Sequence, residues 1–367
     1  MKFLTAIFIF CVVLFLYLHI YYHLKVSNDL EIYTIERPSK DKLEEICDLR
    51  QPVAFEFHSD LVTSRCSIKA LEEEYGAFDV KIRDAEDHGN KDGLYVPLLL
   101  KEAFHLFRTD PTHRFMTENN SDFLAETGLT KTLRHEDCFL RPPMVSRCMY
   151  DLFSGSAGCS TPLRYSLCYR NFLYLTGGSA RVKLIPPRSS RYLYTVKDYD
   201  NFEYRSPVNP WVVQPQYRGD MDKVKSLDLE LSAGTVVYIP AYWWYSISYD
   251  KVSTIVNFQY RTYMNTLAIL PELFLCFLQK QNVKIESVEK VPAREAEPAA
   301  GKANGQGESS APTNGQGPQR TTAPVRSAIP IPPPSAAGGD PAGVGDGGFG
   351  DAVSAAAPFE VSAASSS

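Results

Sequence analysis

The sequence predicts a mainly β fold, a sandwich or small barrel, preceded by a mixed α/β layer. Two observations predict it. Short runs of alternating apolar and polar residues follow one another over 163–258, separated by Gly, Pro, Asn and Asp turn residues. Residues 30–140 instead mix short strand-like and helix-like patterns. An apolar helix precedes this layer, and a low-complexity tail follows the barrel.

Each expected element has its own pattern. In the layer, helices are expected at Ser39–Leu49, Ile68–Tyr75, Leu98–Phe107 and Asp122–Gly128, and strands at Pro52–Phe57 and Phe78–Ile82. In the barrel, strands are expected at Leu163–Cys168, Phe172–Leu175, Arg181–Ile185, Arg191–Thr195, Trp211–Gln214, Asp228–Leu231, Thr235–Ile239, Tyr245–Tyr249 and Ser253–Phe258. Thr266–Gln281 predicts a strongly apolar helix with a break near Pro271, because proline interrupts the helical hydrogen bonds.

The N-terminus predicts a membrane anchor. From Phe3 to Leu24 there is no Lys, Arg, Asp or Glu, and about 20 such residues suffice to cross a bilayer. A cleaved signal peptide is the alternative, but the run is long for one and no small-x-small cleavage site follows it. We therefore expect a single-pass membrane protein anchored through residues 3–24. The flanking charges favour a lumenal or external domain only slightly.

Composition sets the other boundaries. Residues 298–367 contain 46 Ala, Gly, Pro or Ser among 70, which predicts disorder because such a segment buries little apolar surface. The expected domains are an anchor at 1–27, a folded domain at 28–290 and a tail at 291–367. Within the folded domain we expect a barrel core at about 160–262 and a C-terminal helix at about 265–282. The formal net charge of −5 argues against general nucleic-acid binding.

Two segments carry a specific resemblance. One runs from Tyr165 to Pro187 and includes Asn171, Gly178-Ser-Ala180-Arg and Leu184-Ile-Pro-Pro. The other contains Ile239-Pro-Ala-Tyr-Trp243-Trp244-Tyr245, followed by Val256-Asn257-Phe258. Together they resemble the JmjC/cupin-like family, which implies a double-stranded β-helix, a jelly-roll barrel. Membrane-tethered proteins of this kind resemble cupin-like proteins of large DNA viruses. Similarity to the family also implies that the C-terminal helix pairs two subunits.

The chemistry of that family is not carried over. Active members hold Fe(II) on two His and one carboxylate and bind 2-oxoglutarate through a Lys. Aligned on Asn171, the first His and the carboxylate fall on Tyr165 and Leu167; counted from the lead-in Thr161-Pro-Leu163, they fall on Arg164 and Ser166. The second His falls on Tyr245, and the Lys falls on Ala180. The sequence has 7 His, none after residue 135, so the barrel strands supply no imidazole.

Two readings of the altered pocket stay open. Alternation predicts that Tyr165, Leu167, Tyr169 and Asn171 share one strand face, which in the family looks into the barrel. The pocket has then either collapsed into core or remained open to a small ligand or peptide. Its candidate lining residues are Tyr165, Leu167, Asn171, Trp244, Tyr245 and Asn257.

The expected function is a non-catalytic binding or structural module. It has no catalytic residue, no metal ligand and no cofactor, and it has the membrane and a peptide or protein as partners. The alternative is an Fe(II)/2-oxoglutarate-dependent oxygenase with unconventional ligands.

Overall fold

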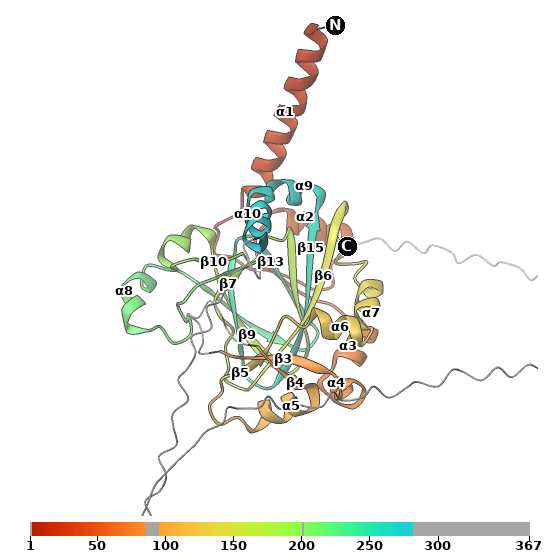
Figure 1. The fold of residues 1–367 in the computed structure, drawn as a ribbon, viewed down its shortest axis with the longest axis vertical. Helices are drawn as coiled ribbons and strands as arrows, with labels where there is room; N and C mark the ends of the chain where they lie inside the picture. Colours follow the sequence, from red (N-terminus) through yellow and green to blue (C-terminus); the bar gives the residue numbers. More distant parts are fainter. Residues whose placement is uncertain (1, 86–94, 200–201, 282–367) are drawn as a thin grey trace, which may run out of the picture. The chain divides into compact units, whose positions relative to one another are not determined.

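Two β-sheets face each other and enclose the core. The computed structural model describes residues 2–85, 95–199 and 202–281. Figure 1 shows the strands of both sheets wrapping around a common interior. The predicted tail and the end of the C-terminal helix lie outside the described residues.

The larger sheet has nine strands in the order β1-β2-β13-β8-β15-β6-β5-β3-β4. Its members are β1 (Tyr33–Ile35), β2 (Val53–Glu56), β13 (Thr235–Pro240), β8 (Arg170–Gly177), β15 (Ser253–Thr262), β6 (Val145–Gly155), β5 (Phe115–Thr117), β3 (Asp79–Asp84) and β4 (Val96–Leu99). All neighbours are antiparallel except β1 and β2. The pairings among β6, β8 and β15 join residues far apart in sequence, and these strands form the centre of the sheet.

The smaller sheet has six antiparallel strands in the order β10-β11-β7-β14-β9-β12. Its members are β10 (Val196–Asp198), β11 (Glu203–Arg205), β7 (Arg164–Tyr165), β14 (Trp244–Tyr249), β9 (Ser179–Ile185) and β12 (Leu227–Ser232). From β7 to β9 and again from β12 to β15 the chain passes from one sheet to the other at each step, as in a jelly roll, whereas β9 to β12 all lie in the smaller sheet. The predicted mainly β fold class is confirmed.

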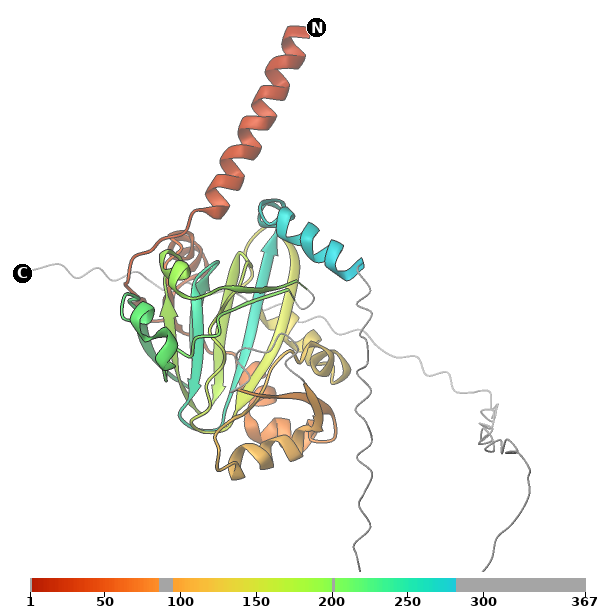
Figure 2. The same cartoon turned by 60° about the vertical axis from the view of Figure 1, so that its left-hand side comes forward.

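Helices cover the outer face of the larger sheet, as Figure 2 shows. They are α2 (Lys40–Asp48), α3 (Asp60–Cys66), α4 (Ile68–Tyr75), α5 (Leu100–Thr109), α6 (Ser121–Glu126) and α7 (Leu129–Glu136). Side chains from these helices, such as Leu43 and Leu133, pack with outward-facing sheet residues such as Phe172, Phe258 and Tyr260. Beyond β15 follow α9 (Tyr263–Ala268) and α10 (Leu270–Gln281); a short α8 (Arg218–Met221) follows β11.

A second apolar cluster fills the space between the sheets. Strand alternation points Leu173 and Ile255 of the larger sheet toward Ala180, Val182 and Ile247 of the smaller sheet. Ala180 therefore lies on the inner face of β9. Lys183 lies on the opposite face, where it binds Asp228 and covers the Trp211 ring.

Several expected strands are wrong for identifiable reasons. Arg191–Thr195 overlaps the 3₁₀ helix Pro187–Tyr192, which the Pro186-Pro187 pair starts. Trp211–Gln214 forms no strand, because the Asn209 carboxamide accepts the N–H groups of Trp211 and Val212 and turns the chain.

The expected strand Leu163–Cys168 is also too long, since only Arg164–Tyr165 pairs. The Ser166 hydroxyl accepts the N–H of Cys168 and ends the ladder there. The sequence also missed β6, the strand of 11 residues that begins before the expected barrel core at 160.

The N-terminal helix α1 (Lys2–Leu24) is long and apolar enough to cross a membrane, with a mean hydropathy of 2.6 and no buried residue over its most apolar window. A signal sequence near the N-terminus would meet the same criteria, so the membrane anchor and its orientation both stay predictions. At its C-terminal end, Arg50 donates hydrogen bonds to the carbonyl oxygens of His23 and Lys25, 2.9 and 2.8 Å away. The helix end is thereby attached to the folded domain.

Pairing of two copies through α10 also stays a prediction.

Candidate functional site

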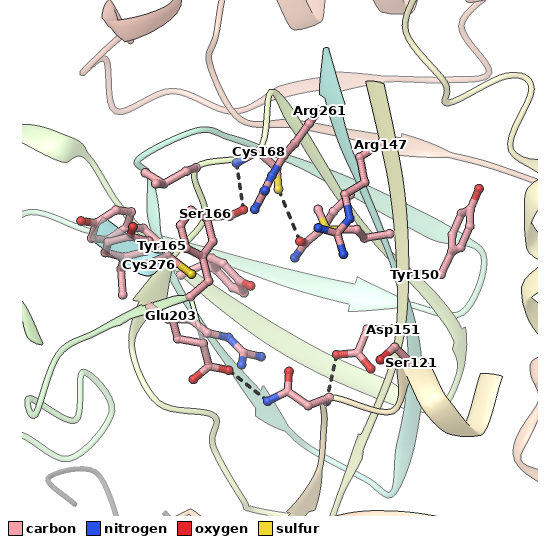
Figure 3. Close-up of a pocket in the computed structure, with 18 of the residues that line it drawn as sticks. Ser121, Arg147, Tyr150, Asp151, Tyr165, Ser166, Cys168, Glu203, Arg261 and Cys276 are labelled. Carbon is pink, nitrogen blue, oxygen red and sulfur yellow. Dashed lines mark hydrogen bonds between the residues drawn. The ribbon is translucent and has the colours of Figure 1, made fainter. Parts of the chain in front are cut away.

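A cavity of about 460 Å³ opens between the two sheets. Its wall comes from β6 and β15 of the larger sheet, from β7, β11 and β14 of the smaller sheet, and from α10. Figure 3 shows Arg147 and Arg261 on one side of this space and Glu203 and Asp151 on the other. The interior is therefore open in this structure, and it is polar rather than purely apolar.

The pairing of β7 with β14 distinguishes the two sequence registers. Tyr245 lies directly opposite Arg164, and Trp244 lies directly opposite Tyr165. Directly opposed residues share a face of the sheet, and Tyr245 belongs to the cluster between the sheets. Arg164, not Tyr165, is therefore the residue that points inward beside Tyr245.

Arg164 is held inside by a carboxylate and two rings. Its Nη1 lies 2.5 Å from Oε2 of Glu118, which is 1% exposed. Its guanidinium carbon lies 4.9 Å from the centroid of the Phe153 ring and 5.5 Å from that of the Tyr245 ring. A cation over aromatic faces gains electrostatic energy, more so where water is excluded. The strand pair β7–β14 therefore presents a fixed cation to the interior.

Glu118 is the centre of a buried network. Arg83 Nη1 donates to its Oε1 over 3.0 Å, and the Tyr95 hydroxyl donates to the same oxygen over 3.1 Å. Burial disfavours the charge of Glu118, yet the guanidinium groups of Arg164, Arg83 and Arg205 outweigh burial and hold the pKa of its carboxyl below its usual range. The carboxylate is therefore charged at neutral pH and fully engaged with its donors.

The network continues across the cavity floor. The Asn119 amide donates to the Tyr95 hydroxyl and to Oε1 of Glu203, 2.7 and 3.0 Å away. Asp151 accepts the backbone N–H groups of Asn119 and Asn120 at 2.9 and 2.7 Å. Burial nevertheless raises the pKa of Asp151 to about 6, against the effect of these hydrogen bonds. Both acidic groups of the cavity already have protein partners.

Tyr165 and Leu167 do not share a strand with Asn171. Because β7 ends at Tyr165 and β8 begins at Arg170, the prediction that positions 165, 167, 169 and 171 lie on one face is wrong. Tyr165 borders the cavity but stacks on Tyr204, with ring centroids 5.0 Å apart, and meets the edge of Trp244 at 4.7 Å. Leu167 is 4% exposed and belongs to the same small cluster as Tyr204.

The other predicted lining residues divide between wall and core. Tyr245 borders the cavity, and burial raises the pKa of its phenol. Asn171 and Asn257 are buried on the inner side of β8 and β15, behind the cavity wall. Trp244 lies on the opposite face of its strand, where its indole N–H donates to the Ser190 hydroxyl. Ala180 lies in the core beneath, opposite Tyr249.

These residues do not fit an iron(II) site of the two-His, one-carboxylate kind. The inward positions of the pair β7–β14 offer a guanidinium and a phenol, and a fixed cation repels a metal ion. In the described part of the chain, no three His, Cys, Asp or Glu side chains come together with metal-site spacing. Ala180, the position that the family resemblance assigns to the Lys that binds 2-oxoglutarate, carries only a methyl group.

Sequence reasoning missed the charged residues that define this cavity. Arg164 appeared only in the second register, and Glu118 lies in a segment without a recognisable motif. Arg147 and Asp151 lie on β6, which was not expected as a strand. The signal that could have found them is the alternation of β6, in which the inward positions 147, 149, 151 and 153 include two charged residues.

The fold and the cavity between its two sheets together define a cupin-like barrel protein. The chain belongs to the family described as cupin-like domain, which matches residues 57–266. HSPB1-associated protein 1 of Homo sapiens is 30% identical over 112 residues, 29% of this chain and 22% of the relative. Lysine-specific demethylase JMJ31 of Arabidopsis thaliana is 28% identical over 158 residues, 41% of this chain and 28% of the relative. The chain thus matches less than a third of the length of these curated relatives.

Proposed function

We propose that this protein is a non-catalytic binding module of the cupin-like family, displayed at a membrane by α1. The observation that carries the proposal is the ion pair of Arg164 with Glu118, opposite Tyr245. A guanidinium at this inward position adds positive charge where the family's active members place a metal ion. Arg164 belongs to a buried network of ion pairs. This supports an interior that is stable without a metal ion.

The open cavity favours binding over a purely structural role. A volume of about 460 Å³ falls within the range of small-molecule sites, about 300–1,000 Å³. Its wall combines aromatic rings, such as Phe153 and Tyr204, with charged groups, such as Arg147 and Asp151. Apolar walls with a few fixed polar groups are typical of ligand sites. A collapsed interior would have left no such space.

The second candidate function is an oxygenase with unconventional ligands. It is favoured by the carboxylates of Asp151 and Glu203 and the thiol of Cys168, which all border the cavity. The relative named lysine-specific demethylase also favours an enzyme. Against it, both carboxylates are engaged by protein donors.

Metal loading separates the two candidates. The full chain, purified in detergent micelles under anaerobic conditions, is given Fe(II) and 2-oxoglutarate, and bound iron and succinate formation are measured. The binding-module proposal expects no stoichiometric iron and no succinate. Iron near one per chain with succinate formed on admission of oxygen would overturn it and establish the oxygenase. The variant Cys168→Ala then tests whether the thiol is one of the ligands.

A further inference from the structure

Two arginines face each other at the rim of the cavity. Arg147 on β6 and Arg261 on β15 are direct cross-strand partners. Both border the cavity, and Figure 3 shows their guanidinium groups pointing into the same space. Like charges directly opposite each other on a sheet destabilise it. A negative charge nearby would relieve this repulsion.

The folded domain does not supply that charge through the described residues. Among them, no carboxylate forms an ion pair with either guanidinium. Arg261 is only 8% exposed, its Nε has no hydrogen-bond partner, and its guanidinium carbon lies 4.8 Å from the centroid of the Phe202 ring. A buried charge without a counter-charge is costly.

The other buried arginines around the barrel show the contrast. Among the described residues, Arg83, Arg164, Arg170 and Arg205 each contact a carboxylate, and Arg50 instead donates to two main-chain carbonyl oxygens, those of His23 and Lys25. Arg261 is buried to a similar degree without one among the described residues. The acids of the cavity are already engaged, since Asp151 accepts backbone N–H groups and Glu203 binds Arg205 and Asn119. The guanidinium groups of Arg147 and Arg261 are therefore available to a ligand in the cavity.

A third polar group stands beside the pair. Gln259 precedes Arg261 by two residues on β15, so it shares the inward face, and it borders the cavity. Its Oε1 accepts the thiol of Cys168 over 3.5 Å, which leaves the amide nitrogen as a donor toward the open space. Two guanidinium forks and an amide N–H₂ are the donors that bind carboxylate and phosphate oxygens.

The geometry points to an oxyanion site. We infer that Arg147, Arg261 and Gln259 bind the carboxylate or phosphate of an organic ligand whose body fills the cavity against Met149 and Tyr204. This inference rests on the proposed binding function and names its ligand class. Ala180, the position that resemblance gives to the cosubstrate Lys, lies in the core on the other sheet and takes no part.

Anion titration of the full chain in detergent micelles tests the site. Glutarate and inorganic phosphate are the probes, at constant ionic strength set with chloride, and the readouts are the melting temperature and calorimetric binding. At least one probe is expected to bind and to raise the melting temperature. Preference for glutarate identifies a carboxylate ligand, and preference for phosphate a phosphate ligand. Arg147→Gln and Arg261→Gln are each expected to weaken binding at least tenfold, whereas Arg218→Gln, an exposed arginine outside the cavity, leaves it unchanged.

Stability without ligand gives a second readout. If Arg147 and Arg261 together bind a ligand, Arg147→Gln removes the repulsion between the two guanidinium groups. The melting temperature of the ligand-free protein is then equal to that of the wild type or higher. A fall in that temperature, or equal anion binding by the wild type and both variants, would overturn the inference. Iron binding with 2-oxoglutarate turnover would instead overturn the proposed function and leave the anion result standing. 2-Oxoglutarate is not used as the probe, because its carboxylates would report on both sites.

Discussion

Arg164 and Tyr245 are direct cross-strand partners, and the guanidinium carbon of Arg164 lies 5.5 Å from the centroid of the Tyr245 ring. This contact lies at the inward positions of β7 and β14, next to the cavity. It also connects the cavity wall to Glu118, which comes from the segment after β5 of the other sheet. The cluster therefore fixes how the two sheets face each other, and its integrity can be tested by unfolding.

Glu118→Gln should strongly destabilise the folded domain. The substitution leaves the guanidinium groups of Arg164 and Arg83 buried without their shared carboxylate. Breaking a buried pair in this way costs about 3–5 kcal/mol. The expected result is a fall of that order in the free energy of unfolding, measured by urea denaturation. Glu72→Gln is the matched control, because its partner Arg108 is 45% exposed at the side chain and such pairs contribute about 1 kcal/mol or less. Equal losses in the two variants would contradict the role of the buried cluster.

Asp151 should make stability depend on pH between about 4 and 6. Burial raises its pKa to about 6 in the folded state, above the ordinary value of 3.8. The folded state therefore favours the protonated form, so this contribution to stability is full below about pH 4 and is lost as the pH rises through 6. Asp151→Asn should remove that decline, which is on the order of 3 kcal/mol for a shift of two units.

The control for the pH profile is Asp122→Asn. The hydrogen bond from Lys81 lowers the pKa of Asp122, so its stabilisation is present above the ordinary value and is lost only as the pH falls below it. The control variant should therefore keep the decline between pH 4 and 6. Unfolding free energies at unit pH intervals from 3 to 8 measure both profiles. A decline that persists in Asp151→Asn would refute the assignment.

Gly178→Ala should destabilise the turn between β8 and β9. Gly178 has φ +89, and an added Cβ would lie 2.8 Å from the Cα of Ser253. Positive φ alone costs a residue with a side chain about 1–3 kcal/mol, and the backbone contact adds to it. Gly219→Ala in α8 is the control, because nothing lies within 4 Å of its added Cβ. Thermal melting of both variants checks the prediction, and a melting temperature for Gly178→Ala equal to that of the control would contradict it.

The barrel could be predicted because its strands carry strong local signals. Thr235–Pro240 and Trp244–Tyr249 are apolar runs bounded by turn residues, and the structure has strands there. The apolar N-terminal helix was equally predictable, since a long uncharged run needs no tertiary context. Gly178 indicated a turn, and the structure gives it the positive φ that only glycine adopts easily.

The charged interior could not be predicted, because its contacts join residues that are far apart in the sequence. Arg147 and Asp151 interrupt the apolar alternation of β6, so the sequence did not identify this central segment as a strand. Glu118 is 46 residues from Arg164 in sequence, and nothing local indicates their contact. The short strand β7 left two registers open until its pairing with β14 was known. Buried ion pairs override the patterns on which sequence reasoning depends.

The pairing of β7 with β14 predicts which substitutions rebuild a metal site. Arg164→His with Ser166→Asp and Tyr245→His places both imidazoles on the inward face, beside the open cavity. Glu118 keeps Arg83 as a partner, so the variant retains part of its buried network. We expect it to bind about one Co(II) per chain, measured by elemental analysis and by the visible absorption of the bound ion.

Tyr165→His with Leu167→Asp and Tyr245→His is the matched control for the other register. It introduces the same ligand types, but position 165 lies opposite Trp244 and shares its face, away from position 245. Two imidazoles on opposite faces of a strand pair cannot bind one ion, because successive side chains point in opposite directions. The control should therefore bind no stoichiometric Co(II). Equal binding by both triple variants would show that the inward face is not set by the Arg164–Tyr245 pair.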